Sequence, residues 1–308
     1  MIRDRRRWFI YILLLVLPFF FVGGPDYDSQ RSLKELWNLG HFFFFMIFIL
    51  VQDSYWCSLH RSIYFRMAAA CITVTCVGLG IELLQLHIDD RFFSWRDVGM
   101  DLMGGVTALL WRAGRSLPPL PATLTAVVSI VVVCVNFVPF GRVVLDEYCS
   151  GRDFPLLAGF ETTIELRRWT GGRGGLTRVP LPRVQGKHSA RITLTTDKYS
   201  GVALNYFPGD WRDRRALAFQ VFNPGHPLTL HYRVHDALHR GEMQTYGNRY
   251  NGRTLLTEGW NEIIIPLAEI LAAPEGRQMD VTKIRGFGVF VVQQKERRVL
   301  FLDNVRLL

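Results

Sequence analysis

The distribution of hydrophobic and polar positions divides the chain near residue 140. Before that point, continuous apolar runs are separated by short polar segments. After it, hydrophobic residues alternate with polar ones, and Gly, Pro, Asn and Asp interrupt them. Long apolar runs are typical of membrane-spanning helices, and short alternating segments are typical of half-buried strands. The pattern predicts two domains, an α-helical membrane bundle in residues 1–140 and an all-β sandwich or jelly roll in residues 160–308, joined by a linker in residues 141–159.

The first domain contains five apolar segments that we expect to cross a membrane. They cover residues 8–24, 36–51, 67–86, 95–111 and 122–140. A hydrocarbon core about 30 Å thick is crossed by about 20 helical residues, so the shorter segments suffice only marginally. The first segment follows a run of arginines but lacks the small-residue cleavage site of a signal peptide. Since further apolar segments follow, we expect it to remain as an uncleaved anchor.

Lysine and arginine predict the orientation of these segments. The basic residues 3–7, the loop with Arg61 and Arg66, and the pair Arg112 and Arg115 all fall on one side of a five-span bundle. Such positive loops are enriched on the cytoplasmic side of membranes. We therefore expect a multi-pass membrane protein with a cytoplasmic N-terminus and an extracytoplasmic C-terminal domain.

Polar side chains interrupt the apolar segments at one common depth. His41, Glu82 and Asp101 each lie four to six residues inside the expected outer end of their segment, which is roughly 6–9 Å along a helix. Gln85 follows Glu82 by three residues and Asp97 precedes Asp101 by four, so each pair shares a helix face. Because ionisable groups are costly within a membrane, we expect a polar pocket that opens to the outer side. The predicted pocket contains His41, Glu82, Gln85, Arg91, Asp97 and Asp101.

Two interpretations of this pocket stay open. The side chains bind a substrate or lipid headgroup, or they only form hydrogen bonds between helices. Both interpretations predict that the side chains converge in space. Gly99, Gly104 and Gly105 would allow the helices to approach closely.

Three motifs in this region resemble those of a known family. Residues 40–48 contain a His-Phe pair, residues 81–85 contain Glu-x-x-Gln, and residues 91–105 contain an Arg, two Asp and a Gly-Gly pair. Their order and spacing over residues 25–112 resemble the VanZ-like membrane family, in which Asn usually occupies the position of Asp101. The resemblance implies a protein of the bacterial cytoplasmic (inner) membrane. The founding member is linked to teicoplanin resistance, and the resemblance brings no catalytic assignment.

Five segments of the second domain have the composition and alternation of strands. They cover residues 189–196, 215–223, 228–236, 260–267 and 284–292. Short strands separated by turn residues are typical of sandwiches and jelly rolls. A helical turn is expected after Pro266. The final residues, 301–307, resemble the end of galactose-binding-like, carbohydrate-binding jelly rolls, a resemblance that implies a structural role for their Asp-Asn pair.

The charge of the second domain favours an acidic partner. Residues 151–308 contain 23 Lys and Arg against 15 Asp and Glu, whereas residues 1–150 contain 13 against 12. A basic domain attracts anionic lipid headgroups or cell-wall polymers. The predicted topology excludes nucleic acid as a partner.

Aromatic side chains of the second domain are candidates for a sugar-binding surface, because a flat apolar ring stacks on the face of a pyranose. The candidate ligand-binding residues are Tyr206, Trp211, Tyr246 and Tyr250, and Tyr199 is a further candidate. The alternative is that most of them pack in the core or in turns. His231 and His235 lie on one face of a strand and are expected to face solvent without binding a metal.

These features favour a binding protein over an enzyme. We expect the bundle to hold a membrane lipid or lipid-linked partner and the sandwich to bind a glycan, glycolipid or cell-wall component. An intramembrane enzyme that acts on a lipid headgroup, with Glu82 or Asp101 as base and His41 beside it, is the alternative, although no catalytic motif supports it. A transporter component is a third possibility without a visible inverted repeat. The five cysteines form no Cys-x-x-Cys pair, and neither a metal site nor a cofactor is expected.

Overall fold

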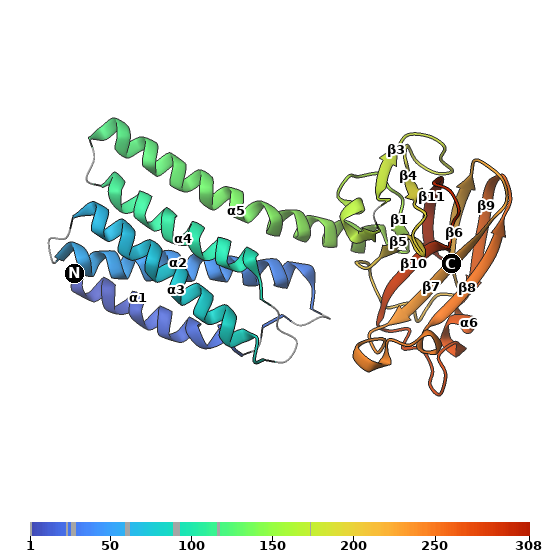
Figure 1. Ribbon diagram of the computed structural model, residues 1–308, viewed down its shortest axis with the longest axis horizontal. Helices are drawn as coiled ribbons and strands as arrows, with labels where there is room; N and C mark the ends of the chain where they lie inside the picture. Colours follow the sequence, from blue (N-terminus) through green and yellow to red (C-terminus); the bar gives the residue numbers. More distant parts are fainter. Residues whose placement is uncertain are drawn as a thin grey trace. The chain divides into compact units, whose positions relative to one another are not determined.

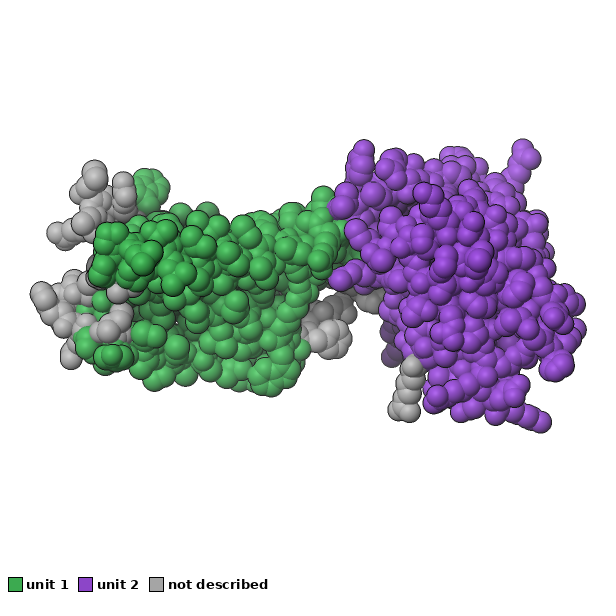
Figure 2. All heavy atoms as spheres, turned by 90° about the horizontal axis from the view of Figure 1, so that it is seen from above, with its two compact units in different colours: residues 1–144 green, residues 145–308 purple. Residues whose placement is uncertain are grey.

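The chain folds into two compact units of different secondary structure. The computed structural model describes residues 2–22, 24–25, 29–58, 62–88, 93–115, 118–172 and 174–308. Figure 2 shows unit 1 (residues 1–144) in green and unit 2 (residues 145–308) in purple. Unit 1 is helical and unit 2 contains two β-sheets (Figure 1). The expected combination of a helical half and a β-sandwich is confirmed.

Unit 1 is built from α-helices joined by short connections (Figure 1). Its elements are α1 (Ile2–Val16), the 3₁₀ turn η1 (Leu17–Phe20), α2 (Arg31–Ser58), α3 (Ile63–Gln85), α4 (Trp95–Gly114) and α5 (Pro119–Asp153), whose last turns belong to unit 2. Within the described residues, α2, α3 and α5 are long and apolar enough to cross a membrane. The apolar stretch Arg7–Phe20 is shorter.

Glycines allow α2, α3 and α4 to pack closely. A Cβ atom on Gly104 would collide with the backbone carbonyl of Phe42, and one on Gly105 would lie 2.9 Å from the side chain of Val74. Gly99, in contrast, has open space around it. Small residues at such contacts let helix backbones approach and strengthen van der Waals packing. The tight packing positions polar side chains from three helices next to one another.

A buried ion cluster joins the same three helices at their other ends. The carboxylate of Asp53 in α2 accepts hydrogen bonds from Arg66 Nε in α3 (2.6 Å) and from Arg112 Nε in α4 (2.8 Å). Asp53 is buried, and pairing is what makes a buried carboxylate tolerable. It lies about 18 Å along α2 from His41, at 1.5 Å per residue. The three helices are therefore tied together by polar contacts near both ends.

Unit 2 is a sandwich of two antiparallel sheets (Figure 1). Its strands are β1 (Leu156–Ala158), β2 (Trp169–Gly171), β3 (Leu176–Val179), β4 (Ser189–Leu194), β5 (Tyr199–Leu204), β6 (Ala216–Asn223), β7 (Leu228–Asp236), β8 (Tyr250–Leu256), β9 (Gly259–Pro266), β10 (Ile284–Val292) and β11 (Arg298–Leu307). The first sheet has the order β3-β4-β11-β6-β9, with β1 also paired to β11. The second has the order β2-β5-β10-β7-β8.

The core of unit 2 lies between the sheets. Along β7 and β10, side chains such as Val234, Phe287 and Val289 are buried and contribute to this core, where Phe287 contacts Phe219 of β6. Their immediate neighbours in β7 point to the opposite face of the second sheet, because successive side chains in a strand alternate. The outer face of the second sheet is thus left available for other contacts.

Residues 141–159 do not form the linker that the composition predicts. Helix α5 continues to Asp153, and β1 begins at Leu156. The helix continues because residues 143–145 prolong its apolar run. Pro155 then ends it, since proline disfavours a helical conformation in the residue before it. The expected helical turn after Pro266 is present as α6 (Leu267–Ala272).

The terminal Asp-Asn pair makes structural contacts. Asp303 is buried in β11, and its Oδ2 accepts hydrogen bonds from the backbone N–H groups of Val184 (2.7 Å) and Gln185 (3.1 Å). Burial raises the pKa of Asp303, and these hydrogen bonds oppose that effect. Asn304 has a φ of 55° and lies at an irregularity in the pairing of β11 with β6. Asp303 thereby anchors the loop at Val184 and Gln185 to the sandwich.

Candidate functional site

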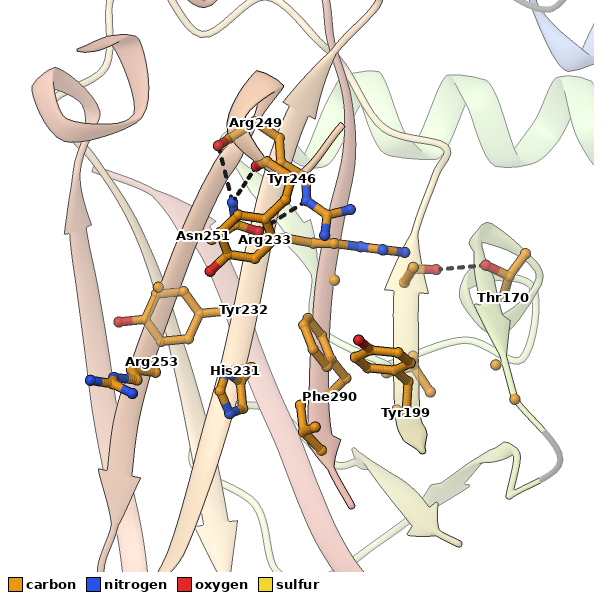
Figure 3. A pocket seen from close by; sticks show the side chains of 18 residues that line it. Thr170, Tyr199, His231, Tyr232, Arg233, Tyr246, Arg249, Asn251, Arg253 and Phe290 are labelled. Carbon is orange, nitrogen blue, oxygen red and sulfur yellow. Dashed lines mark hydrogen bonds between the residues drawn. The ribbon is translucent and has the colours of Figure 1, made fainter. Parts of the chain in front are cut away.

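The outer face of the second sheet contains a groove of about 730 Å³ (Figure 3). It is formed by β2, β5, β10, β7 and β8 and by the segment before β8. The lining residues are Thr170, Gly171, Gly172, Tyr199, Gly201, Val202, Ala203, His231, Tyr232, Arg233, Tyr246, Arg249, Asn251, Gly252, Arg253, Gly288, Phe290 and Val292. This volume falls in the range of known ligand sites.

Glycines form the floor of the groove. Gly201 of β5 is the register partner of Phe290 in β10, and a Cβ on Gly201 would lie 2.5 Å from the Cα of Phe290. A Cβ on Gly288 would lie 3.2 Å from Nε of Arg233. The side chains of Arg233 and Phe290 therefore occupy space that larger residues at the two glycines would need. A sheet position without a side chain lets another group approach the backbone closely.

Aromatic rings line one part of the groove. Figure 3 shows Phe290 between His231 and Tyr199. The rings of His231 and Phe290 are stacked, with centroids 5.5 Å apart, and Tyr199 meets Phe290 edge-on at 6.1 Å. Tyr199 is 62% exposed and Tyr246 is 74% exposed. Exposed rings on a scaffold of this kind offer flat apolar surfaces beside polar groups.

Three arginines line the groove next to these rings. Arg249 Nε donates to Oδ1 of Asn251 (2.9 Å), and the guanidinium of Arg233 lies 5.9 Å from the centroid of Phe290. Within the described part of the chain, Arg233, Arg249 and Arg253 have no ion pair with a carboxylate. Burial and the charge of Arg249 lower the pKa of Arg233, and burial lowers the pKa of Arg249. The groove thus carries positive charge that no acidic side chain neutralises.

Two histidines at the end of β7 are held neutral. The rings of His235 and His239 lie 5.0 Å apart. Burial, followed by the charges of His239 and Arg233, lowers the pKa of His235 to about 4. A Cβ on Gly286 would collide with the ring of His235, which shows how closely this ring covers the sheet. The expectation that His231 and His235 simply face solvent is corrected, because both are partly buried against the outer face of the sheet.

The aromatic candidates from the sequence occupy different environments. Tyr246 and Tyr199 line the groove. Trp211 is fully buried and donates from its indole nitrogen to the carbonyl of Pro208 (3.1 Å), so its expected exposure is wrong. Tyr250 packs against the core and donates its hydroxyl to Glu269, and Tyr206 lies outside the groove lining. Arg233 and Phe290 were not among the residues predicted from the sequence. The alternating glycines of β10 were a visible signal of a surface that another group can approach.

The polar residues expected in the bundle converge around one histidine. His41 of α2 is 1% exposed, and its Nδ1 lies 2.9 Å from Oδ1 of Asp101 in α4. Glu82 of α3 is buried, and its Oε2 accepts a hydrogen bond from the backbone N–H of Ser94 (2.7 Å). Gln85 donates to the carbonyl of Phe20 (2.8 Å), which ties η1 to α3.

One further carboxylate belongs to this cluster. A ring nitrogen of His41 and one carboxylate oxygen each of Glu82 and Asp97 lie within 4.8 Å of one another. Asp97 is in the first turn of α4, where its N–H is capped by Ser94 Oγ (3.2 Å). Arg91, the remaining member of the predicted pocket, lies outside the described residues. The cluster can hold a cation or exchange protons, since it combines an imidazole with several carboxylates.

Comparison with solved structures finds similarity in the C-terminal half. The chain is similar to a family 11 carbohydrate-binding module from Clostridium thermocellum in complex with a β-1,3-1,4-mixed-linked tetrasaccharide, with 16% identity over 50% of this chain and 94% of that one and a TM-score of 0.39. The family 11 module of the cellulase Lic26A-Cel5E from Clostridium thermocellum gives 17% identity over 50% and 92%, with a TM-score of 0.37. An exo-β-agarase gives 14% identity over 50% of this chain and 24% of that one, with a TM-score of 0.40.

Comparison with protein families and with curated proteins gives no match. No family model and no curated protein matches this chain. The VanZ-like resemblance of the first half therefore stays a prediction from its motifs.

Proposed function

We propose that the sandwich binds an anionic glycan in the groove on its second sheet. The observation that carries the proposal is the placement of exposed aromatic rings beside arginines that lack acidic partners. Tyr199 and Tyr246 offer flat rings to the apolar faces of sugar units. The arginines offer donors to their hydroxyl and acidic groups. Sites of this composition, apolar with a few convergent polar groups, are typical of small-ligand pockets.

The charge of the groove selects for acidic sugars. The guanidinium group presents a rigid set of donors that match carboxylate and phosphate geometry, and it stays charged at neutral pH. Unit 2 is basic as a whole, so long-range attraction would add to the contacts inside the groove. A polysaccharide with regularly spaced carboxylates, such as a polymer of uronic acids, fits both features. Such polymers and other acidic cell-wall components are the class of ligand that we propose.

The helical unit is proposed to anchor this module in the bacterial inner membrane. Several apolar side chains of α5, among them Val127, Val131 and Val135, are exposed, and only 6% of its most apolar window is buried inside the protein. A helix of this kind needs an apolar surrounding, which a lipid bilayer supplies. The cytoplasmic N-terminus and extracytoplasmic sandwich follow from the distribution of basic residues. The VanZ-like character of this unit is part of the same proposal.

Binding of the full-length protein to defined polysaccharides tests the function. The protein, purified in detergent, would be measured against polygalacturonate and against neutral galactan by affinity electrophoresis or calorimetry. Tyr199→Ala and Arg233→Met are each expected to weaken polygalacturonate binding at least about tenfold, as central interface residues do. The matched controls are Tyr206→Ala and Arg212→Met, since both residues lie outside the groove. Failure to bind any acidic polymer, or equal losses in the controls, would overturn the proposal.

A further inference from the structure

The buried cluster of unit 1 combines the side chains that bind transition metals. It brings together one imidazole from α2, one carboxylate from α3 and one from α4. We propose that His41, Glu82 and Asp97 bind one divalent transition-metal ion, and that Asp101 holds the histidine ring as a positioning residue. This inference is independent of glycan binding by the sandwich. It also departs from the sequence expectation of no metal site.

Two buried polar atoms of the cluster residues lack a hydrogen-bond partner. His41 is 1% exposed and Glu82 is fully buried, yet His41 Nε2 and Glu82 Oε1 have no hydrogen-bond partner. A buried polar atom without a partner costs about 1–3 kcal/mol, more when the group is charged. Two such atoms on neighbouring helices, one a nitrogen lone pair and one a carboxylate oxygen, are complementary to a cation between them.

Asp101 determines which nitrogen of His41 is available. The carboxylate Oδ1 of Asp101 lies 2.9 Å from Nδ1, so the proton of the neutral ring resides on Nδ1 and Nε2 carries the lone pair. Metal-binding histidines commonly donate their other N–H to a carboxylate in this way, which orients the ring and raises its basicity. Gly78 of α3 makes room for this arrangement, because a Cβ there would lie 2.6 Å from Asp101 Oδ2.

The nearest described arginine of α4 is engaged elsewhere. Arg96 donates through Nη1 to Oε1 of Glu35 (3.0 Å) and pairs with the second oxygen of the same carboxylate. It therefore balances Glu35, and within the described residues no lysine or arginine forms an ion pair with Glu82 or Asp97. A divalent ion would compensate Glu82 and Asp97 together, whereas the hydrogen bond of His41 goes to Asp101.

The ligand set favours zinc or manganese over magnesium or calcium. Imidazole suits zinc and other transition metals, whereas magnesium and calcium prefer sites made entirely of oxygen ligands. Zinc ligands lie about 2.0–2.2 Å from the ion, and the three candidate ligand atoms already lie within 4.8 Å of one another. Three protein ligands leave a coordination position free, as in zinc sites that bind water or substrate. The site would thus have an open position for a small anionic or neutral ligand.

Metal content of the full-length protein tests the site directly. The protein would be purified in detergent with a histidine-free tag, stripped with EDTA, and equilibrated with Zn²⁺ or, in parallel, Mn²⁺. Elemental analysis after desalting is expected to find about one ion per chain with at least one of the two metals. Absence of both ions from the folded wild-type protein overturns the proposal without reference to any variant.

Variants separate this site from metal bound at the surface. Glu82→Gln and Asp97→Asn keep the shape of the side chain and are each expected to lower metal affinity at least about tenfold. Asp101→Asn is expected to weaken binding by about 10–100-fold while leaving the three ligands in place. Glu35→Gln removes a carboxylate outside the ligand set and should bind like the wild type. Equal metal binding by Glu82→Gln and the wild type would show an adventitious ion only and would overturn the proposal.

A spectroscopic probe, together with size-exclusion chromatography, distinguishes loss of the metal site from loss of the fold. Co²⁺ gives a visible absorption that depends on its ligands, so it reports the site rather than the total metal. The band is expected in the wild type and in Glu35→Gln, and its intensity should fall in Asp97→Asn, whose side chain is the least buried of the three. Size-exclusion profiles that match the wild type would show that the variants are folded. A Co²⁺ spectrum unchanged by Asp97→Asn would exclude Asp97 as a ligand.

Discussion

The guanidinium of Arg168 and the carboxylate of Asp146 form a buried ion pair, with Nε and Oδ1 2.8 Å apart. Arg168 also donates to the backbone carbonyls of Leu157 and Asp146 (3.3 Å each). Asp146 belongs to the last turns of α5 and Arg168 lies just before β2. The end of this helix is therefore an integral part of the sandwich.

This ion pair predicts where the soluble unit begins. A fragment of residues 145–308 should be soluble, give a mainly β circular dichroism spectrum, and exceed a fragment of residues 155–308 in stability. The expected difference is about 3–5 kcal/mol, because the shorter fragment lacks the carboxylate that pairs with Arg168. Asp146→Asn in the longer fragment should cause much of the same loss in urea unfolding. Asp153→Asn, which removes only an exposed pair with Arg152, is the control. Equal stability of the two fragments would contradict the prediction.

The proposed topology predicts the location of the C-terminus. An odd number of spans with a cytoplasmic N-terminus delivers residues 145–308 to the outer side. An alkaline phosphatase fusion after Leu308 should be active in cells, and a green fluorescent protein fusion at the same position should be dark. Fusions after Arg115 should show the reverse pattern. A fluorescent C-terminal fusion would refute the five-span arrangement.

The partly buried His235 on the outer face predicts a pH dependence of stability. Burial holds the pKa of His235 at about 4 in the folded state, against about 6.5 in an unfolded chain. Between these values the unfolded state binds a proton that the folded state does not, so stability falls as the pH decreases from 6.5 to 4. The full effect approaches about 3 kcal/mol at the acidic end. His235→Gln in the fragment of residues 145–308 should flatten this dependence, whereas substitution of the exposed His226 should not. If the stability of His235→Gln and of the parent fragment changed with pH in the same way, His235 would not be the cause of the pH dependence.

The glycine floor predicts a variant that loses binding and keeps the fold. Gly288→Val adds a side chain at an outward position of β10, where it displaces Arg233 and raises the floor. Polygalacturonate binding should weaken at least about tenfold. The melting temperature should change little, because valine is favoured in strands. Thr229→Val, on an exposed position of β7 outside the groove, is the control. Undiminished polymer binding by Gly288→Val would place the ligand elsewhere.

Much of the fold was predictable because its elements have strong local periodicity. The segments expected at residues 215–223, 228–236 and 284–292 correspond to β6, β7 and β10 within one residue at each end. The strands β1, β2 and β3 were missed because three or four residues contain too little alternation to recognise. Glycine inside β5 and β8 weakened the strand signal there.

The two sites differ in how far the sequence could indicate them. His41, Glu82 and Asp101 could be placed together because a membrane thickness gives each helix position a depth. The residues of the groove could not be placed together from the sequence. Phe290 and Arg233 become neighbours only through the strand order β5-β10-β7-β8. That order depends on pairing between strands far apart in the chain, which local patterns do not specify.

The glycines and outward-facing side chains of the groove also bear on how this protein can diversify. Inward neighbours on the same strands, such as Val234 and Phe287, form the core, so recognition and folding are assigned to alternate residues of β7 and β10. Substitutions at Tyr199 or Arg233 can therefore accumulate with little loss of folding stability. If the groove binds the proposed polymer, its ligand can change while the scaffold is inherited unchanged, and a laboratory library restricted to these outward positions would sample the same freedom.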